Sequence, residues 1–201
     1  IISDSEFDLL AHKHNYNKVG YTVTDAIPHT YQMYSLQKCF DISKAPLDIN
    51  DCVCSPKLDG AAVSLLYADG CLELALTRGD GKQGRDITDK MSTLVPTEIM
   101  EKRLIQITGE VVAPSSIPNS RNFAAGSLGL KGEEGLVEFQ TRPLVFVAYD
   151  ATPELAQDYS SALRRLEFHG FNTVDRFDTT DYPTDGLVYR LSDNLKYLRL
   201  G

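Results

Sequence analysis

The chain has 201 residues, of which 42% are hydrophobic and 24% are charged. These fractions are ordinary for a folded protein and exclude a disordered or fibrous chain. Twenty basic against twenty-eight acidic residues give a formal net charge of −8. No overall positive field attracts nucleic acid, so any contact with DNA must be local or come from another part of the protein.

The apolar stretches and the cysteines indicate the cellular compartment of the chain. Residues 61–68 and 144–149, among the longest apolar stretches, are far shorter than the roughly 20 residues that span a membrane. The N-terminus lacks the basic-then-apolar design of a signal peptide, so we expect no membrane association. The cysteines at positions 39, 52, 54 and 71 include no CxxC pair. This argues against a zinc site or a disulfide framework and favours reduced thiols in a cytosolic protein.

The predicted elements begin with a short N-terminal helix, because SDSE at 3–6 has capping-box spacing and apolar residues follow. Residues 16–50 predict an irregular connector. Asp69-Gly70 is a two-residue hairpin signal between two expected strands. We expect strands at 52–57, 61–68, 71–78, 104–113, 144–149 and 186–191, and helices at 122–128, 160–168 and 193–200. Mostly strands with inserted helices predict an α+β fold built on antiparallel sheets.

The motif KLDG at 57–60 is the first candidate for chemistry. It places Lys57 at a strand end, Asp59 two residues on, and a glycine that permits a tight turn. Taken alone, it describes a solvated strand end at least as well. An ordinary lysine amine is protonated at neutral pH, so a nucleophilic role needs nearby cations or desolvation.

Two motifs that follow supply groups for binding an anion or a sugar. TRGDG at 77–81 joins Arg78 to glycines that let a backbone approach a phosphate, although a flexible turn is the commoner meaning. GEV at 109–111 puts the carboxylate of Glu110 into an apolar strand. An unpaired charge is costly there unless the position lies on an exposed edge.

Two later motifs add a helix start and a second acid-glycine pair. NSRNFAAGSL at 119–128, which contains Arg121, leads polar groups into small residues, as at a helix N-terminus that favours an anion. DGLVYR at 185–190 opens a strand with Asp185 and carries Arg190 further along it.

In this order and spacing, the motifs resemble the adenylation domain of NAD-dependent DNA ligases. Upstream, His29 with MYSL at 33–36 is similar to that family's HxxPMLSL segment, and DSEFD at 4–8 to its DAEYD segment. The resemblance implies a ligase-type nucleotidyltransferase fold, unlike ATP-grasp, with antiparallel sheets, flanking helices and a short N-terminal helical segment. Residues 1–30 would be the remnant of a nicotinamide mononucleotide (NMN) binding segment and connector, and residues 31–201 the adenylation domain.

The resemblance also implies an enzyme, a DNA ligase that uses NAD. Lys57 would attack the α-phosphate of NAD, release NMN and carry AMP covalently, for later transfer to a 5′-phosphate at a nick during DNA replication or repair. Arg78 and Arg190 would neutralise the phosphate, and Mg²⁺ near Glu110 and Asp185 would stabilise its charge.

The remaining site residues take their expected roles from the same resemblance. Glu110 is similar to the family's ribose-binding glutamate, and Asp59 and Asp185 to its other site carboxylates. Because the segment at 4–8 resembles the part that holds the NMN half, NAD is the expected adenylate donor. The residues expected to contact the nucleotide are Asp4, Phe7, Asp8, Ser35, Leu36, Ser55, Arg78, Glu110, Arg121 and Arg190.

The chain departs from the family pattern at four positions. Ser55 replaces a glutamate that contacts adenine, and Phe7 replaces a tyrosine. Arg190 replaces a lysine, which keeps the charge but enlarges the group. Gly129 replaces an arginine, with Lys131 nearby as a possible substitute.

By the same resemblance, the chain stops before the family's final catalytic lysine and lacks its DNA-binding modules. We therefore expect nicked double-stranded DNA to be bound through missing domains or a second subunit, with no membrane and no zinc in this segment. The small size suggests a viral or split ligase in the cytoplasm of a bacterial or virus-infected bacterial cell. Two alternatives stay open: an ATP- or GTP-using nucleotidyltransferase of the RNA ligase or capping type, and a non-catalytic nucleotide-binding subunit.

Overall fold

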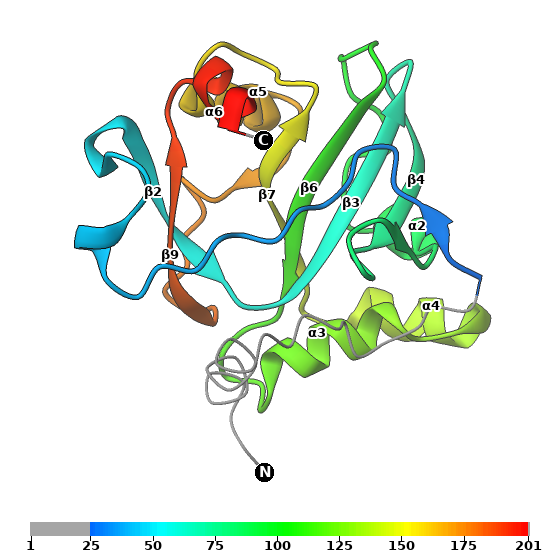
Figure 1. Cartoon of the computed structure of the whole chain (residues 1–201). Helices are drawn as coiled ribbons and strands as arrows, with labels where there is room; N and C mark the ends of the chain where they lie inside the picture. The colour runs from blue at the N-terminus through cyan, green and yellow to red at the C-terminus, as the bar shows by residue number, and fades with distance from the viewer. Residues whose placement is uncertain (1–24, 201) are drawn as a thin grey trace.

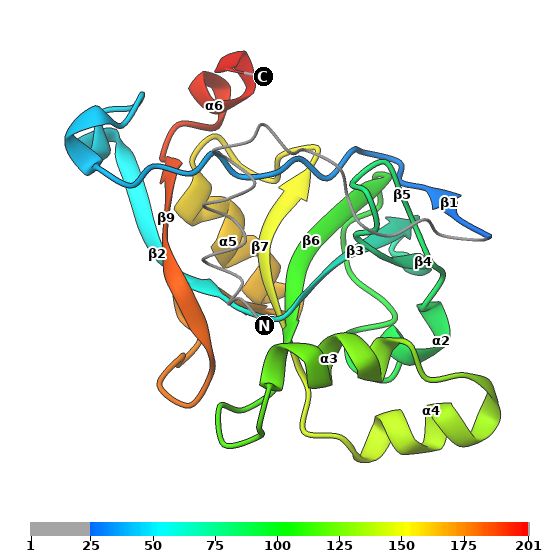
Figure 2. The same cartoon turned by 60° about the horizontal axis from the view of Figure 1, so that its bottom comes forward.

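The computed structural model describes residues 25–200 and is built around a five-stranded sheet. The strand order in this sheet is β4-β3-β6-β7-β8. A separate antiparallel pair, β2 with β9, stands beside it, and a third short pair joins β1 to β5 (Figures 1 and 2). The strands are β1 (Ile27–Pro28), β2 (Cys52–Leu58), β3 (Ala61–Ala68), β4 (Cys71–Thr77), β5 (Gln83–Gly84), β6 (Ile105–Val112), β7 (Val145–Thr152), β8 (Asn172–Thr173) and β9 (Thr184–Leu191).

The helices are short and lie around the sheets. Helices α3 and α4 lie together at one end of the sheet, and α5 packs on β7 and β8 (Figure 1). Helix α6 follows β9, and the N–H of its first residue, Asn194, donates to the carbonyl of Gln157 just before α5. The α-helices are α2 (Thr88–Met91), α3 (Ser120–Leu128), α4 (Gly132–Thr141), α5 (Tyr159–Phe168) and α6 (Asn194–Leu200), and two 3-10 turns occupy Ile42–Lys44 and Ile49–Asp51.

The two faces of the five-stranded sheet differ in polarity. Val63, Leu65 and Tyr67 point to one face and are fully buried. The edge of the Tyr67 ring meets Phe171, which follows α5, at a centroid distance of 6.1 Å. Because side chains alternate along a strand, Ser64 and Gln106 face the other way. The hydrophobic core therefore fills one face, and the opposite face is left for polar groups.

The structure confirms the predicted α+β organisation and the nine predicted elements within residues 25–200, with boundaries that shift by a few residues at most. Asp69 and Gly70 both have positive φ, 49° and 83°, as the central positions of a type I′ turn require. Antiparallel pairing prevails, but β7 pairs with β8 in parallel. The predicted helix near the N-terminus lies outside the described residues.

Several short elements were not predicted from the sequence. Helix α4 begins with Gly132, at φ 72°, and holds a second glycine at position 135. Both residues disfavour a helix by propensity, so tertiary packing of Phe139 in the core decides the conformation there. Strands β1, β5 and β8 have two residues each, too few for an alternating pattern to be recognised.

Within the described residues, every helix is too short and too polar to cross a bilayer.

Candidate active site

Lys57 lies at the end of β2, where the pairing with β9 is irregular. The register shifts between Pro56 and Leu58, and Lys57 falls within this shift. Its Nζ donates to both carboxylate oxygens of Asp185, at 2.8 and 2.9 Å. The pair is open to solvent, with side-chain exposures of 39% and 43%. The lysine of one motif and the first acid of another therefore meet across the β2–β9 pair, and a small reactant can reach them.

The turn after Lys57 packs tightly on β6. The Asp59 N–H donates to the carbonyl of Pro183 at 2.9 Å, and the Gly60 N–H donates to Glu110 Oε1 at 3.2 Å. A Cβ at position 60 would stand 2.2 Å from the carbonyl oxygen of Val111. Glycine is needed here because the backbone of the turn touches the neighbouring strand. This contact fixes the lysine strand against Glu110.

Glu110 stands on the polar face of the sheet, opposite Ala62 of β3. Burial raises the pKa of Glu110 to about 7, although the bond from Gly60 and the Lys57 ammonium both oppose the rise. The sequence left open whether this carboxylate lies on an exposed edge. β6 is an inner strand between β3 and β7, so the edge interpretation was wrong.

Asp59 connects the lysine turn to α3. Arg121 lies in the first turn of α3, and its Nε is 3.3 Å from Asp59 Oδ1. The residue before the helix, Asn119, is left-handed at φ 53° and offers no side-chain cap. The helix start therefore directs an arginine at the site's second carboxylate.

Arg78 holds the other side of the site. Its Nη2 donates to Ser35 Oγ at 2.6 Å, and its backbone N–H is bonded to Ala62 of β3. Leu36 follows Ser35 and is 57% exposed. The TRGDG segment is an ordered turn: Gly79 and Gly81 have φ values of 56° and 88°.

Arg190 contacts a different set of side chains from those around Lys57. It is 7% exposed, and its Nη2 donates to Glu154 Oε1 at 2.9 Å. Asp150 lies 3.8 Å away. The guanidinium also lies over the rings of Tyr159 and Tyr197, at 4.7 and 3.4 Å from their centroids. Two half-buried acids and two aromatic rings surround the guanidinium, and the sequence pattern did not reveal these partners.

The remaining predicted positions are structural or lie elsewhere. Ser55 is buried at 6% exposure in the middle of β2. Gly129 ends α3, and a Cβ there would lie 3.9 Å from the guanidinium of Arg85, while Lys131 is exposed. Arg85, from another segment, therefore lies near the position where the resemblance to the family implies an arginine. Asp4, Phe7 and Asp8 lie outside the described residues.

Tyr149 is a residue near the site that was not predicted from the sequence. It lies on β7 at the bulge facing β6, and burial, reinforced by the charge of Glu110, raises its pKa above the ordinary value. The Arg78 cation acts on the pKa of Tyr149 in the opposite direction. The tyrosine at the end of the apolar run 144–149 was the available signal.

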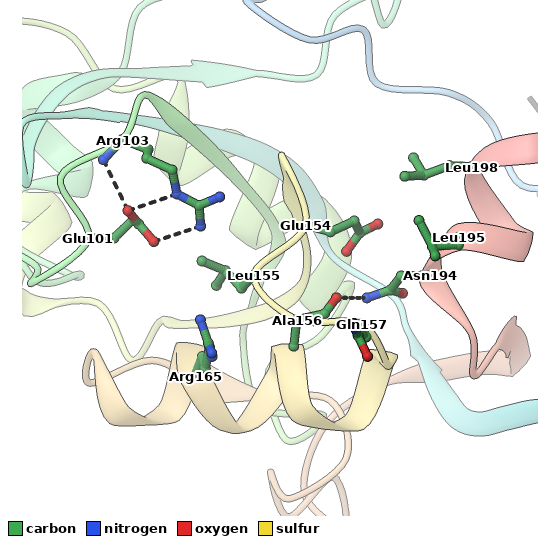
Figure 3. A pocket seen from close by; sticks show the side chains of 10 residues that line it. All are labelled: Glu101, Arg103, Glu154, Leu155, Ala156, Gln157, Arg165, Asn194, Leu195 and Leu198. Atoms are coloured by element: carbon green, nitrogen blue, oxygen red, sulfur yellow. Dashed lines mark hydrogen bonds and ion pairs between the residues drawn. The ribbon is translucent and has the colours of Figure 1, made fainter.

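A hollow of about 600 Å³, which Lys57 does not line, lies between the segment before β6, the β7–α5 loop, α5 and α6 (Figure 3). Glu154 contributes to it, so the hollow borders the Arg190 cluster. None of the predicted site residues lines it. The lining residues are Glu101, Arg103, Glu154, Leu155, Ala156, Gln157, Arg165, Asn194, Leu195 and Leu198.

Within residues 25–200, groups of three or more histidine, cysteine, aspartate or glutamate side chains suited to hold a metal ion do not occur. The carboxylates at the site come singly, from Asp59, Glu110 and Asp185.

Comparison with known proteins connects this arrangement to one family. Residues 22–117 match the family described as NAD-dependent DNA ligase adenylation domain. A DNA ligase of Aliarcobacter butzleri is 36% identical over 156 residues, covering 62% of this chain and 24% of that protein. A DNA ligase of Pelagibacter ubique is 28% identical over 269 residues, covering 100% and 39%. One of Sulfurimonas denitrificans is 38% identical over 141 residues, covering 55% and 22%. The chain thus spans less than two fifths of these relatives, and the resemblance seen in the sequence is confirmed.

Proposed function

Because residues 22–117 belong to the adenylation-domain family of NAD-dependent DNA ligases, we propose that this chain is the self-adenylating part of such a ligase. Lys57 Nζ attacks the α-phosphorus of NAD, and an N–P bond forms as the bond from phosphorus to the bridging oxygen breaks. NMN leaves with that oxygen, and AMP stays on the lysine. The observation that carries the proposal is the contact of Lys57 with Asp185, beside a turn that is bonded to Glu110.

Asp185 receives the proton in this proposal. The Lys57 ammonium must lose a proton before its nitrogen can attack, and a carboxylate oxygen 2.8 Å away is within the range for direct transfer. The exposed position of the pair lets the proton pass on to water. Positioned acid-base groups of this kind contribute roughly 10²–10⁴-fold to a rate.

Arg78 is assigned the neutralisation of the α-phosphate. Its guanidinium carries a fork of donors suited to phosphate oxygens, and its Nη2 donates to the uncharged hydroxyl of Ser35. Arg190 is expected to contribute less, because Glu154 and Asp150 already balance its charge. Ser35 and Leu36 then bind the adenylate, and the ribose hydroxyls bind Glu110.

Mg²⁺ fits the carboxylates of the site. This ion is usually held by one or two carboxylates together with phosphate oxygens and water. Glu110 and Asp185 provide such ligands beside the lysine turn. When bound, the ion would supply positive charge to the transferring phosphoryl group.

The experiment is to incubate the whole chain with Mg²⁺ and labelled NAD, ATP or GTP, and to measure covalent adduct by intact mass and acid lability. We expect an AMP adduct from NAD, its loss in Lys57→Ala, and its retention in Lys102→Ala. Lys102 is a matched control, since it also carries an exposed ion pair, with Asp69. An adduct that persists in Lys57→Ala overturns the proposal. Labelling by ATP or GTP alone indicates the RNA ligase or capping class, and saturable binding without adduct indicates a non-catalytic subunit.

The later steps depend on parts of a ligase beyond this chain. The AMP passes to a 5′-phosphate at a nick in double-stranded DNA, in the bacterial cytoplasm, once separate domains or a second subunit bind the DNA. The net charge of −8 supports this division of labour, because phosphate binding needs clustered cations. A nicked duplex should receive AMP from the isolated adenylated chain far more slowly than when a DNA-binding ligase fragment is added.

A further inference from the structure

A strap of extended chain, residues 27–36, crosses the polar face of the five-stranded sheet. It starts at β1, runs past β4, β3 and β6, and continues toward the β2–β9 pair, as both views show (Figures 1 and 2). Ser35, near its end, accepts a hydrogen bond from Arg78. The course of this strap therefore determines where Ser35 and Leu36 stand in the proposed nucleotide site.

Gln106 binds the middle of the strap, at Tyr31, through both the oxygen and the nitrogen of its side-chain amide. The Tyr31 N–H donates to Gln106 Oε1 at 3.0 Å, and Gln106 Nε2 donates to the Tyr31 carbonyl at 2.8 Å. A backbone N–H can only donate and a carbonyl can only accept, so both bonds together require an amide in one orientation. The side chain replaces the pairing that a neighbouring strand would give to Tyr31.

This glutamine is unusual in its strand. Gln106 is 3% exposed, between the fully buried Ile105 and Ile107. It shares the polar face of β6 with Glu110, four residues along. An unpaired amide at such a depth costs roughly 1–3 kcal/mol, and the two bonds to Tyr31 of the strap satisfy both ends of this amide. The residue therefore serves the strap rather than the core.

The rest of the strap is held by contacts with other segments. His29 bonds with Ser64 Oγ at 2.8 Å and with the Arg78 carbonyl at 3.0 Å. The Met33 N–H donates to Gly81 at 2.8 Å. These contacts connect the strap to β3 and to the TRGDG turn at 77–81. Gln106 ties it to the strand that carries Glu110.

We propose that Gln106 is a positioning residue that fixes the strap, so that Ser35 and Leu36 are preorganised for the nucleotide. The inference rests on the proposed function, because it assigns Ser35 and Leu36 to the nucleotide. If the strap occupies its place in only a fraction of the molecules, the apparent affinity for the nucleotide falls in proportion to that fraction. The chemical step on Lys57, held by β2 and β9, is not altered.

The test compares Gln106→Leu and Gln106→Glu with Thr173→Val in the full chain. Leucine removes both bonds, and glutamate keeps the acceptor but places a second oxygen against the Tyr31 carbonyl. Thr173 is a matched control. It is similarly buried on the same sheet, and its hydroxyl bonds to Glu167 and Asp175, which lie outside the strap. Loss of two neutral hydrogen bonds corresponds to about a tenfold effect or somewhat more.

We expect both Gln106 variants to increase amide hydrogen exchange at Tyr31 and Met33 about tenfold. We also expect the KM for NAD in adduct formation to rise about tenfold, with kcat changed less than twofold. Thr173→Val should lower the unfolding midpoint without either change. Unaltered strap exchange overturns the proposal, as does faster exchange with an unaltered KM. If the wild-type chain forms no adduct, the proposed function fails, while hydrogen exchange still decides whether Gln106 holds the strap.

Discussion

Lys57 and Asp185 are 128 positions apart in the chain, yet Nζ of the lysine contacts both oxygens of the aspartate, at 2.8 and 2.9 Å. The irregular pairing of β2 with β9 makes this contact possible, because the register shifts where the lysine stands. The proton acceptor and the nucleophile therefore come from two paired strands, and any change in their register separates them.

Asp185→Asn tests this relationship at nearly constant shape. The amide cannot take a proton from the lysine, so we expect adduct formation from NAD to slow by roughly 10²–10⁴-fold, with partial recovery at high pH, where hydroxide replaces the acceptor. Single-turnover labelling across a pH series measures the effect. Asp181→Asn, in the loop that precedes β9, is the control and should keep the wild-type rate. A wild-type rate in Asp185→Asn contradicts the role in proton transfer.

The strands around the site were predictable because their chemistry is local. The apolar run 61–68 and the Asp69-Gly70 turn define a hairpin whatever surrounds it, and both appear as expected. The contact of Gly60 with Glu110 could be expected only through the family resemblance. It depends on which strand lies next to β3, and that is a property of the topology.

The position of Arg190 could not be read from the sequence for a different reason. Its motif predicts a cation on β9, but Glu154 and Asp150, which pair with it, stand outside any motif. Gln106 was also missed, because a single glutamine in an apolar strand looks like an ordinary solvated position. Pairings between distant segments decide both cases.

Gly60→Ala should disrupt the fold locally and remove activity. A Cβ at this position meets the Val111 carbonyl at 2.2 Å, so the turn has to move away from β6 and loses its bond to Glu110. Overpacking of this kind costs about 1–3 kcal/mol, measured as unfolding free energy in urea. Gly126→Ala is the matched control, because a Cβ there meets nothing within 4 Å. Inside α3, alanine should stabilise by about 0.5–1 kcal/mol. Equal stability of both variants contradicts the argument.

Arg190→Met should destabilise the chain strongly at pH 8 and less at pH 5. The substitution leaves the acids Glu154 and Asp150 without their cation, and an unpaired buried charge costs about 3–5 kcal/mol. Burial, with the charge of Asp150, already raises the pKa of Glu154 to about 7 while Arg190 opposes the rise. At pH 5 the acid can be neutral. Denaturant unfolding at the two pH values measures the difference.

Arg190→Met/Glu154→Gln is the companion variant, and it should recover part of the stability lost at pH 8. A loss that is equal at both pH values, or no recovery, contradicts the assignment of Arg190 to the acid cluster. The rate of adduct formation by Arg190→Lys is a second measurement. We expect a rate near that of the wild type if Arg78 neutralises the charge of the α-phosphate.

Glu110 should make the chain less stable as the pH rises from about 5 to 8. Its pKa is about 7 in the folded chain, raised by burial from the ordinary 4.5. Between these values the folded state binds more protons than the unfolded state, so the free energy of unfolding falls with rising pH. The difference corresponds to about 3 kcal/mol at most. Glu110→Gln keeps an acceptor for the Gly60 N–H and should flatten this part of the profile.

Glu154 titrates in the same interval, because its pKa is also about 7, so Glu110→Gln should retain a residual slope. Glu110→Gln/Glu154→Gln should lose most of it, whereas the exposed Glu133→Gln on α4 should follow the wild type. Urea unfolding at pH 5, 6, 7 and 8 measures all four proteins. If Glu110→Gln retains the full wild-type slope, Glu110 is charged throughout the range. It would then enter the site as a carboxylate already paired with the Lys57 turn, and the nucleotide would meet that charge at every pH.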